Sequence, residues 1–240
     1  MKPWLRGDLS GVDPRTEMRL LRDAVLAAAH RGEDLCPFWG ALARLDPVAC
    51  AELAAGPRAV PHRAAVEGAL TVVEVLEEVI APSGLYFRLA DLAADAGPSI
   101  LETAARRHPS ADWVVRLSRK YDPVPGRIHL SVHAGGPHFA AACAACARAG
   151  LVEGLTAAGE ETGSPHPAVC LCRIQRIDAC VEVAARTLDA HPAAPVVQWL
   201  AAVYGPEMEE LVKRITVRLS NPAAVERVAR LAALMGCQGT

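Results

Sequence analysis

The sequence predicts an all-α protein of about a dozen short helices, which the composition and the placement of proline both favour. Hydrophobic residues make up 52% of the 240-residue chain but aromatic residues only 4%, so the core must be built mainly from Ala, Leu and Val. Alanine has the highest intrinsic helix propensity, whereas a β-sheet core favours Ile, Thr, Tyr and Phe. Proline, Asp, Ser and Asn also recur at points where helices would begin.

In the first half of the chain, proline marks the starts of the expected helices. Proline is favoured in the first helical turn because the N–H that it lacks would have no partner there. Gly32, Gly56 and Pro82 are the expected stops. The helices expected on these grounds are residues 14–30, 47–56, 64–80, 98–107 and 111–121.

The second half repeats this pattern at Pro137, Pro167, Pro206 and Pro222. Residues 167–190 are expected to form one long helix, because an apolar stripe with heptad-like spacing runs through them. The stripe consists of Cys170, Ile174, Ile177, Val181, Ala184 and Leu188. Residues 156–165, rich in Gly and Glu, are expected to form a loop.

Residues 122–136 interrupt the helical pattern with two prolines and three glycines. Within them, apolar and polar residues alternate over 127–132, which is typical of a strand. We therefore expect a short strand near 127–133 or an extended linker, between an N-terminal helical half at 1–121 and a C-terminal half at 137–240. A single domain is the alternative.

Two segments of the chain resemble one another: residues 108–123 align without gaps to 191–206. The pairs Val114/Val197, Leu117/Leu200 and Tyr121/Tyr204 fall on one face of a helix. A duplicated helical hairpin would give stacked helix pairs, as in helical-repeat solenoids. The alternative is a chance match between segments rich in Ala and Pro.

Cysteine usage and the first residues predict a cytoplasmic protein. Residues 1–13 contain Arg6 and Asp8 and no apolar stretch, so we expect no secretory signal. Eight cysteines in such a chain are expected to be reduced thiols. No apolar run approaches the roughly 20 residues that span a bilayer, so no membrane partner is expected. The 22 arginines against three lysines are typical of a GC-rich genome.

A group of histidines and cysteines could hold a metal ion. These residues are His129, His133, His138, Cys143 and Cys146. Imidazole and thiolate are the ligands that zinc prefers. However, Phe139, Cys143, Cys146 and Gly150 share one helical stripe, so the two cysteines are expected in the core. We therefore predict no cofactor and keep His133, His138, Cys143 and Cys146 as an alternative metal site.

The expected helix at 111–121 offers a candidate partner-binding face. Trp113, Arg116, Arg119 and Lys120 could bind phosphate or an acidic protein. Asp112 lies four residues before Arg116 and is expected to pair with it. Because the net charge of the chain is −2, we do not expect a general nucleic-acid binder.

Cys172 is predicted to be a reactive thiol. On a continuous 167–190 helix it would point away from the apolar stripe, toward the side that carries Arg176 and Arg186. An exposed thiol near arginines ionises and reacts more readily.

No catalytic motif is present, and no catalytic residue is assigned. The sequence therefore favours a non-catalytic protein-interaction module, a helical scaffold or adaptor of the kind used in bacterial signalling or defence. One alternative is a metal- or thiol-dependent enzyme that uses residues 129–146. Another is a nucleic-acid-binding regulator that uses Arg116, Arg119 and Lys120. Nothing in the sequence identifies the protein partner.

Overall fold

The computed structural model describes residues 62–71, 73–78, 81–92, 96–205 and 208–234, together with Thr16, Arg19 and Asp23. Every element within these ranges is a helix and none is a strand, so the predicted all-α class is confirmed for the part of the chain described. Of the helices expected at 14–30 and 47–56, the structure describes only Thr16, Arg19 and Asp23, each of them helical; the other residues lie outside the described ranges, as do Pro206 and Gly236. The chain forms two compact units, residues 1–103 and 104–240.

Unit 1 contains helices packed around a small core of Leu76, Leu85 and Leu89. The Tyr86 hydroxyl, itself buried, donates a hydrogen bond of 2.8 Å to Glu77. Pro82 was expected to stop a helix, but it also begins one that the sequence did not predict. The bounds are α4 His62–Thr71, α5 Val73–Glu77, α6 Pro82–Leu92 and α7 Gly97–Arg107, the last running past the end of the unit.

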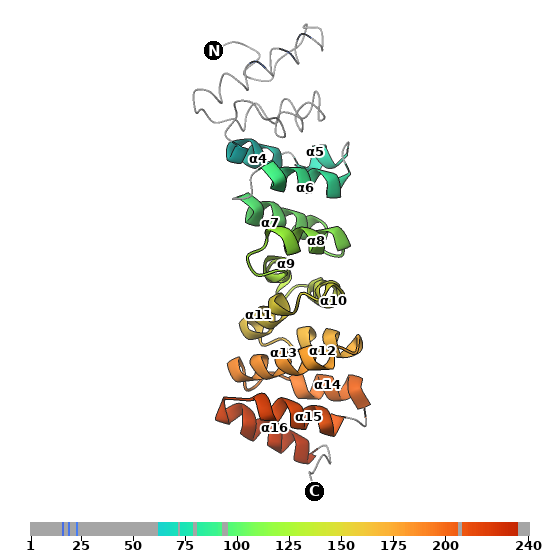
Figure 1. The fold of residues 1–240 in the computed structure, drawn as a ribbon, viewed down its shortest axis with the longest axis vertical. Helices are drawn as coiled ribbons and strands as arrows, with labels where there is room; N and C mark the ends of the chain where they lie inside the picture. The colour runs from blue at the N-terminus through green and yellow to red at the C-terminus, as the bar shows by residue number, and fades with distance from the viewer. Residues whose placement is uncertain are drawn as a thin grey trace. The chain divides into compact units, whose positions relative to one another are not determined.

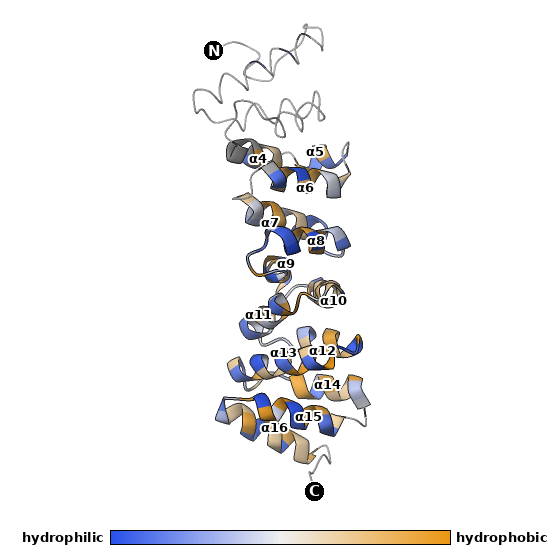
Figure 2. Ribbon diagram, viewed as in Figure 1, coloured by the Kyte–Doolittle hydropathy of each residue, from blue (hydrophilic) through white to orange (hydrophobic). Residues whose placement is uncertain are grey.

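Unit 2 holds the remaining helices, most of which carry both hydrophobic and hydrophilic residues (Figure 2). They are α8 Asp112–Tyr121, α9 Arg127–His133, α10 Phe139–Ala149, α11 Val152–Thr162, α12 His166–Arg173, α13 Ile177–Ala190, α14 Val196–Tyr204, α15 Met208–Arg218 and α16 Pro222–Leu234.

Helix α16 packs on α15, and helices α8 to α15 alternate between two layers. In one, which we call layer A, α8 packs on α10, α10 on α12, and α12 on α14. In the other, layer B, α9 packs on α11, α11 on α13, and α13 on α15 (Figure 1). Each helix also contacts its neighbour in the other layer. These contacts do not conflict with the stacked, solenoid-like hairpins expected from the sequence, and a true repeat stays a prediction.

The core of unit 2 lies between the layers and is built mainly from small side chains, as the composition predicted. Cys143 and Cys146 are fully buried on the stripe that begins at Phe139. Leu155 and Val183 bring α11 and α13 into the same cluster. Small residues let the backbone pack closely: an added Cβ on Gly154 of α11 would lie 2.5 Å from the carbonyl oxygen of Pro125, in the segment before α9.

Residues 127–133 form helix α9, so the predicted strand or extended linker was wrong. The alternation of apolar and polar residues was misleading, because this segment buries one face of a helix, formed by His129, Leu130 and His133. Its start is fixed by the Asp122 carboxylate, which accepts hydrogen bonds from the backbone N–H of Val124 and Ile128, at 3.1 and 2.9 Å.

Residues 122–136 lie inside unit 2. Gly126, just before α9, adopts a left-handed φ of 95°, and its N–H donates to the buried Ser118 hydroxyl at 2.6 Å. The division of the chain by this segment into an N-terminal half at 1–121 and a C-terminal half at 137–240 stays a prediction.

The single helix expected over 167–190 is two helices, and this prediction was also wrong. The chain turns at residues 174–176, where Gln175 has a left-handed φ of 62°. Hydrogen bonds from the N–H groups of Gln175 and Arg176 to Cys172 and Leu171 close α12. The expected loop at 156–165 is largely helical, because α11 continues to Thr162 and ends at Gly163, with φ 66°.

The two similar segments form α8 and α14, and their equivalent side chains are buried alike. Val114, Leu117, Val197 and Leu200 are all fully buried. Helix α14 packs against α13, as expected, and also against α12 and α15. None of the helices in the described ranges is long and apolar enough to cross a membrane.

Candidate partner-binding surface

Charge is divided unequally between the two layers of unit 2. The four helices of layer A contain five basic residues and a single acidic residue, Asp112. The basic residues are Arg116, Arg119, Lys120, Arg148 and Arg173. Layer A therefore carries a clear excess of positive charge, although the whole chain has a net charge of −2.

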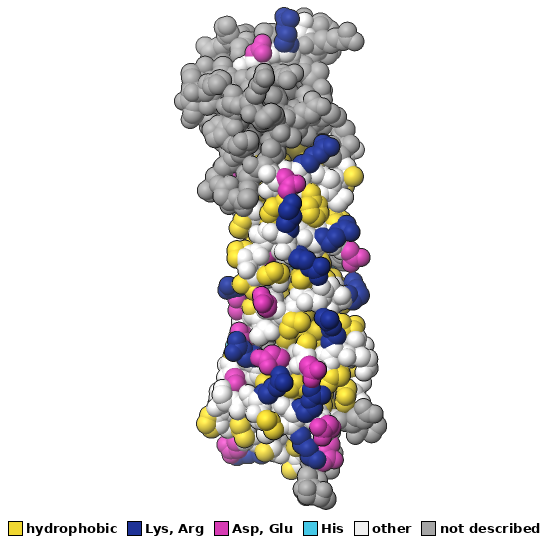
Figure 3. Space-filling view, in the orientation of Figure 1, with side chains coloured by type: hydrophobic (Ala, Val, Ile, Leu, Met, Phe, Trp, Pro, Cys, Tyr) yellow, Lys and Arg dark blue, Asp and Glu magenta, His cyan; other side chains and the backbone are white. Residues whose placement is uncertain are grey.

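Layer B is acidic, with eight carboxylates against five basic residues. Its arginines bind acids on neighbouring helices, so that most charges are internally compensated. These pairs are Arg127–Glu161 at 2.6 Å, Arg186–Glu160 at 2.8 Å, Arg218–Glu182 at 2.9 Å and Arg214–Asp178. Figure 3 shows how basic and hydrophobic side chains are interspersed on one face of unit 2.

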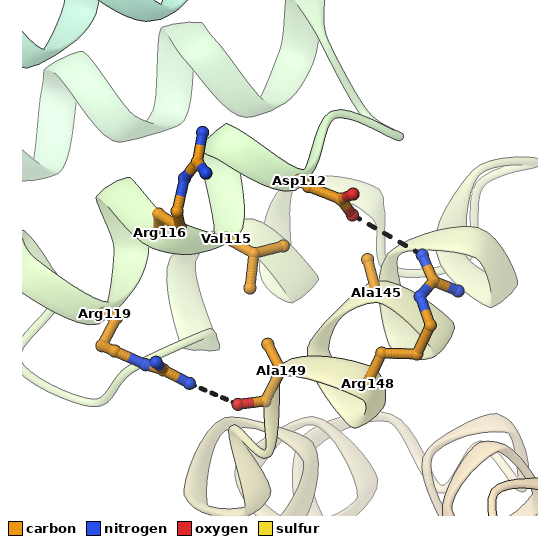
Figure 4. Close-up of a pocket in the computed structure, with 7 residues that line it drawn as sticks. All are labelled: Asp112, Val115, Arg116, Arg119, Ala145, Arg148 and Ala149. Atoms are coloured by element: carbon orange, nitrogen blue, oxygen red, sulfur yellow. Dashed lines mark hydrogen bonds and ion pairs between the residues drawn. The ribbon is translucent and has the colours of Figure 1, made fainter.

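A groove of about 420 Å³ lies between α8 and α10 in layer A. Arg119 reaches from α8 to donate to the carbonyl oxygen of Ala149, and Arg148 reaches from α10 to Asp112 (Figure 4). We call this cavity the α8/α10 groove. It is lined by Asp112, Val115, Arg116, Arg119, Ala145, Arg148 and Ala149.

The groove contains positive charge, on Arg116 and Arg148, that no strong contact within the described part of the chain neutralises. The Arg148–Asp112 separation is 3.7 Å and both side chains are more than half exposed, so this ion pair contributes little. Arg116 is exposed and makes no hydrogen bond or ion pair within the described residues. An anionic ligand could therefore engage Arg116 and Arg148 without breaking a strong contact.

A second groove, of about 290 Å³, continues layer A across α10, α12 and α14. We call it the Trp199 groove; besides alanines and Val169 it is lined by Arg148, His166, Cys170, Arg173, Ile174 and Trp199. His166 packs edge-on against Trp199, with ring centroids 4.9 Å apart. Burial lowers the pKa of His166, and the neighbouring Arg173 lowers it further.

The structure brings together two of the four predicted partner-binding residues. Arg116 and Arg119 line the α8/α10 groove, whereas Trp113 and Lys120 do not. Trp113 packs against His108, with centroids 5.2 Å apart, and the Lys120 ammonium lies 4.8 Å from the centre of the Tyr121 ring. The predicted pair of Asp112 with Arg116 was wrong, because Arg148 of the next layer-A helix takes that position.

The histidines and cysteines of 129–146 divide between the core and the surface. Cys143 and Cys146 are buried, as their spacing predicted, and burial raises the pKa of Cys146 to about 12. The buried His133 ring bonds to the Ala105 carbonyl oxygen at 3.0 Å, while His138 is exposed. No three His, Cys, Asp or Glu side chains within the described ranges converge on a point that could hold a metal ion.

Cys172 is buried, with 1% of its surface exposed, so its predicted exposure was wrong. Because α12 ends before the turn at residues 174–176, Arg176 and Arg186 do not lie on the same helix as Cys172. Burial raises the pKa of this thiol, although a hydrogen bond with Cys180 and the charge of Arg173 oppose that shift. The structural basis for a reactive Cys172 is therefore removed.

Sequence reasoning missed Arg148, Arg173 and Trp199, which line the two grooves. A signal was present: the sequence segments 137–151, 166–177 and 190–206 contain no Asp or Glu, and the first two contain arginines. Acid-free segments alternate with acid-rich ones along the second half of the chain. The sequence does not reveal that the acid-free helices α10, α12 and α14 pack on one another, because this contact depends on the fold.

Comparisons with family models, curated proteins and solved structures found no match to this chain.

Proposed function

We propose that this chain is a non-catalytic protein-interaction module that binds an acidic segment of a protein partner on layer A. The observation that supports this proposal is the charge division between the layers: the four layer-A helices hold five basic residues and one acidic residue. Arginine is over-represented where carboxylates are bound, because its planar guanidinium can donate two parallel hydrogen bonds.

The contrast with layer B supports a role in recognition. In layer B, arginines are used to link neighbouring helices through ion pairs with Glu and Asp. In layer A, Arg116 and Arg173 are exposed and have no such partner among the described residues. Arginines that do not hold the fold together are free to determine partner choice and association rate.

The surface favours a protein over a nucleic acid. Its exposed arginines are interspersed with large apolar side chains, namely Ile174, Trp199 and Val203. An interface with aromatic and aliphatic residues among arginines is typical of protein–protein contacts. A nucleic-acid site depends on many phosphate contacts, which five basic residues beside an acidic second layer provide poorly.

A charge-reversal pull-down from the native host tests the proposal. The variant Arg116→Glu/Arg173→Glu should lose a partner that the wild-type chain retains, with an increase in Kd of at least about tenfold. Neither arginine supports the fold through an ion pair in the described residues, so the thermal unfolding of this variant should be nearly unchanged.

The matched control is Lys213→Glu/Arg230→Glu, which changes the net charge equally on α15 and α16. It removes only two exposed pairs within single helices, Lys213–Glu209 and Arg230–Glu226. The control should retain the partner. If both double variants retain it equally, or both lose it equally, layer A is not the binding surface.

A further inference from the structure

We propose that the Trp199 groove is an anchor pocket, and that the partner's acidic segment inserts one bulky apolar side chain into it. This inference rests on the proposed function and adds the chemistry of the segment: acidic residues next to a Leu, Met, Phe or Trp anchor. The occupant is a segment of another protein.

The size and lining of the groove fit a side chain. Its volume of about 290 Å³ lies at the lower end of the range for ligand sites, which fits one or two side chains rather than a large cofactor. Val169 and Cys170 of α12 and the methyl groups of Ala140 and Ala144 of α10 provide apolar walls. A buried apolar side chain gains free energy in such surroundings in proportion to the area removed from water.

Trp199 leaves a large apolar surface open to solvent on the edge of this groove. It is 44% exposed, and Ile174, directly after the end of α12, is 38% exposed. The edge-on contact with His166, which itself packs edge-on against Phe139, holds the indole in place. An ordered, exposed tryptophan beside a pocket is typical of residues that dominate the binding free energy of protein interfaces.

Charge complementarity identifies the kind of segment that carries the anchor. Arg148 and Arg173 line the Trp199 groove, and Arg148 also lines the α8/α10 groove. The two grooves are therefore joined at one guanidinium. A segment whose apolar side chain enters the Trp199 groove places its neighbouring residues beside these arginines, where carboxylates are favoured.

A second copy of this chain fits the surface less well. The acidic layer B is the natural counterpart, but its Glu160, Glu161 and Glu182 are already bound to arginines of the same chain. Among the described residues of layer B, Glu153 and Glu210 are exposed without an ion pair, so layer B offers few carboxylates to a second copy unless those pairs break. The proposal therefore commits to a separate acidic protein.

Selection from a displayed library of random-sequence peptides, with the full chain as bait, tests the anchor. We expect the selected peptides to combine several Asp or Glu residues with one bulky apolar residue. Replacing that apolar residue with Ala, or Trp199 with Ala in the chain, should raise Kd at least about tenfold. Ile174→Ala should have a smaller effect in the same direction and provides a second variant if Trp199→Ala is destabilised. Val217→Ala, an exposed position on α15 in layer B, should leave Kd unchanged.

The outcomes separate this inference from the proposed function. One outcome would overturn the anchor and leave the proposed function standing. In it, the selected peptides are acidic but share no apolar position, the variants Trp199→Ala and Ile174→Ala bind them as tightly as the wild type, and Arg116→Glu/Arg173→Glu does not bind them. Peptides without acidic enrichment would overturn both. The anchor proposal would also be overturned if the chain bound single-stranded RNA more tightly than the selected peptides at the same salt concentration. It would likewise be overturned if light scattering showed self-association of the wild type that Trp199→Ala lost.

Discussion

His129 lowers the stability of unit 2, because its polar ring is buried in an apolar core. It is fully buried on α9, and neither ring nitrogen has a hydrogen-bond partner among the described residues. Burial, together with the smaller effect of the neighbouring His133, lowers the pKa of its imidazole from 6.5 to about 4. The folded protein therefore holds this ring neutral where the unfolded chain would protonate it.

This difference predicts a loss of stability in mild acid. As the pH falls from 6.5 toward 4, the unfolded state binds a proton that the folded state excludes, so the free energy of unfolding decreases. The loss that depends on His129 is on the order of 3 kcal/mol near pH 4 and is absent above pH 7. Denaturant unfolding of wild type and His129→Leu at pH 7 and pH 4.5 measures it. An equal pH dependence in both proteins would contradict this account of His129.

The buried thiols predict slow alkylation. Burial raises the pKa of Cys143, Cys146, Cys170, Cys172 and Cys180, the cysteines within the described ranges. Since the thiolate is the nucleophile, all five should label slowly in the native protein and rapidly in denaturant. Mass spectrometry after brief alkylation assigns each site. Rapid native labelling of Cys172 would show that this residue is accessible after all.

At the scale of the helix, the starts of several helices could be predicted from the sequence, whereas a turn inside an apolar run could not. Helix α7 covers the predicted 98–107 segment, and α16 begins at Pro222, where the Asn221 side chain accepts a hydrogen bond from the backbone N–H of Ala223. These starts depend on residues adjacent in sequence. The break at Gln175 could not be found in the same way, because the apolar stripe continues through it and a non-glycine residue adopts the left-handed conformation there.

The close packing of α11 against the backbone before α9 predicts opposite effects for two glycines. A Cβ on Gly154 of α11 would lie 2.5 Å from the Pro125 carbonyl oxygen and 2.8 Å from a backbone carbon of Gly126. Because backbone atoms cannot move aside cheaply, Gly154→Ala should destabilise by about 1–3 kcal/mol. The control, Gly84→Ala on α6, meets no atom within 4 Å and should stabilise by up to about 1 kcal/mol. Thermal unfolding of both compares them; a stable Gly154→Ala would show that α11 does not pack so closely.

The resemblance between α8 and α14 predicts equal roles for two leucines. Leu117 and Leu200 are both fully buried at equivalent positions. Truncation of either to Ala should lower the free energy of unfolding by about 2–5 kcal/mol, because a cavity forms in a packed interface. Arg116→Ala should be nearly silent for stability. A silent Leu117→Ala or Leu200→Ala would show that the two helices are not equivalent in packing.

At the scale of the molecule, the site depends on which helices lie side by side. The sequence identified Arg116 and Arg119, because they lie on one helix. Arg148 and Arg173 joined them only when the alternation of layers was known, since α8, α10 and α12 are separated along the chain by helices of layer B. Spacing within one helix is fixed by helical geometry, whereas proximity between helices requires the fold.

The central claim, that layer A of unit 2 is the partner-binding surface, is tested most directly by site-specific photo-crosslinking in the native host. A photoreactive residue replaces Ala140, which is exposed on α10 and lines the Trp199 groove, or Val217, which is 86% exposed on α15 in layer B. We predict that the Ala140 position forms a covalent adduct with one protein, through an acidic peptide that contains a bulky apolar residue, and that the Val217 position does not. An adduct with the same protein from Val217 and none from Ala140 would contradict the claim.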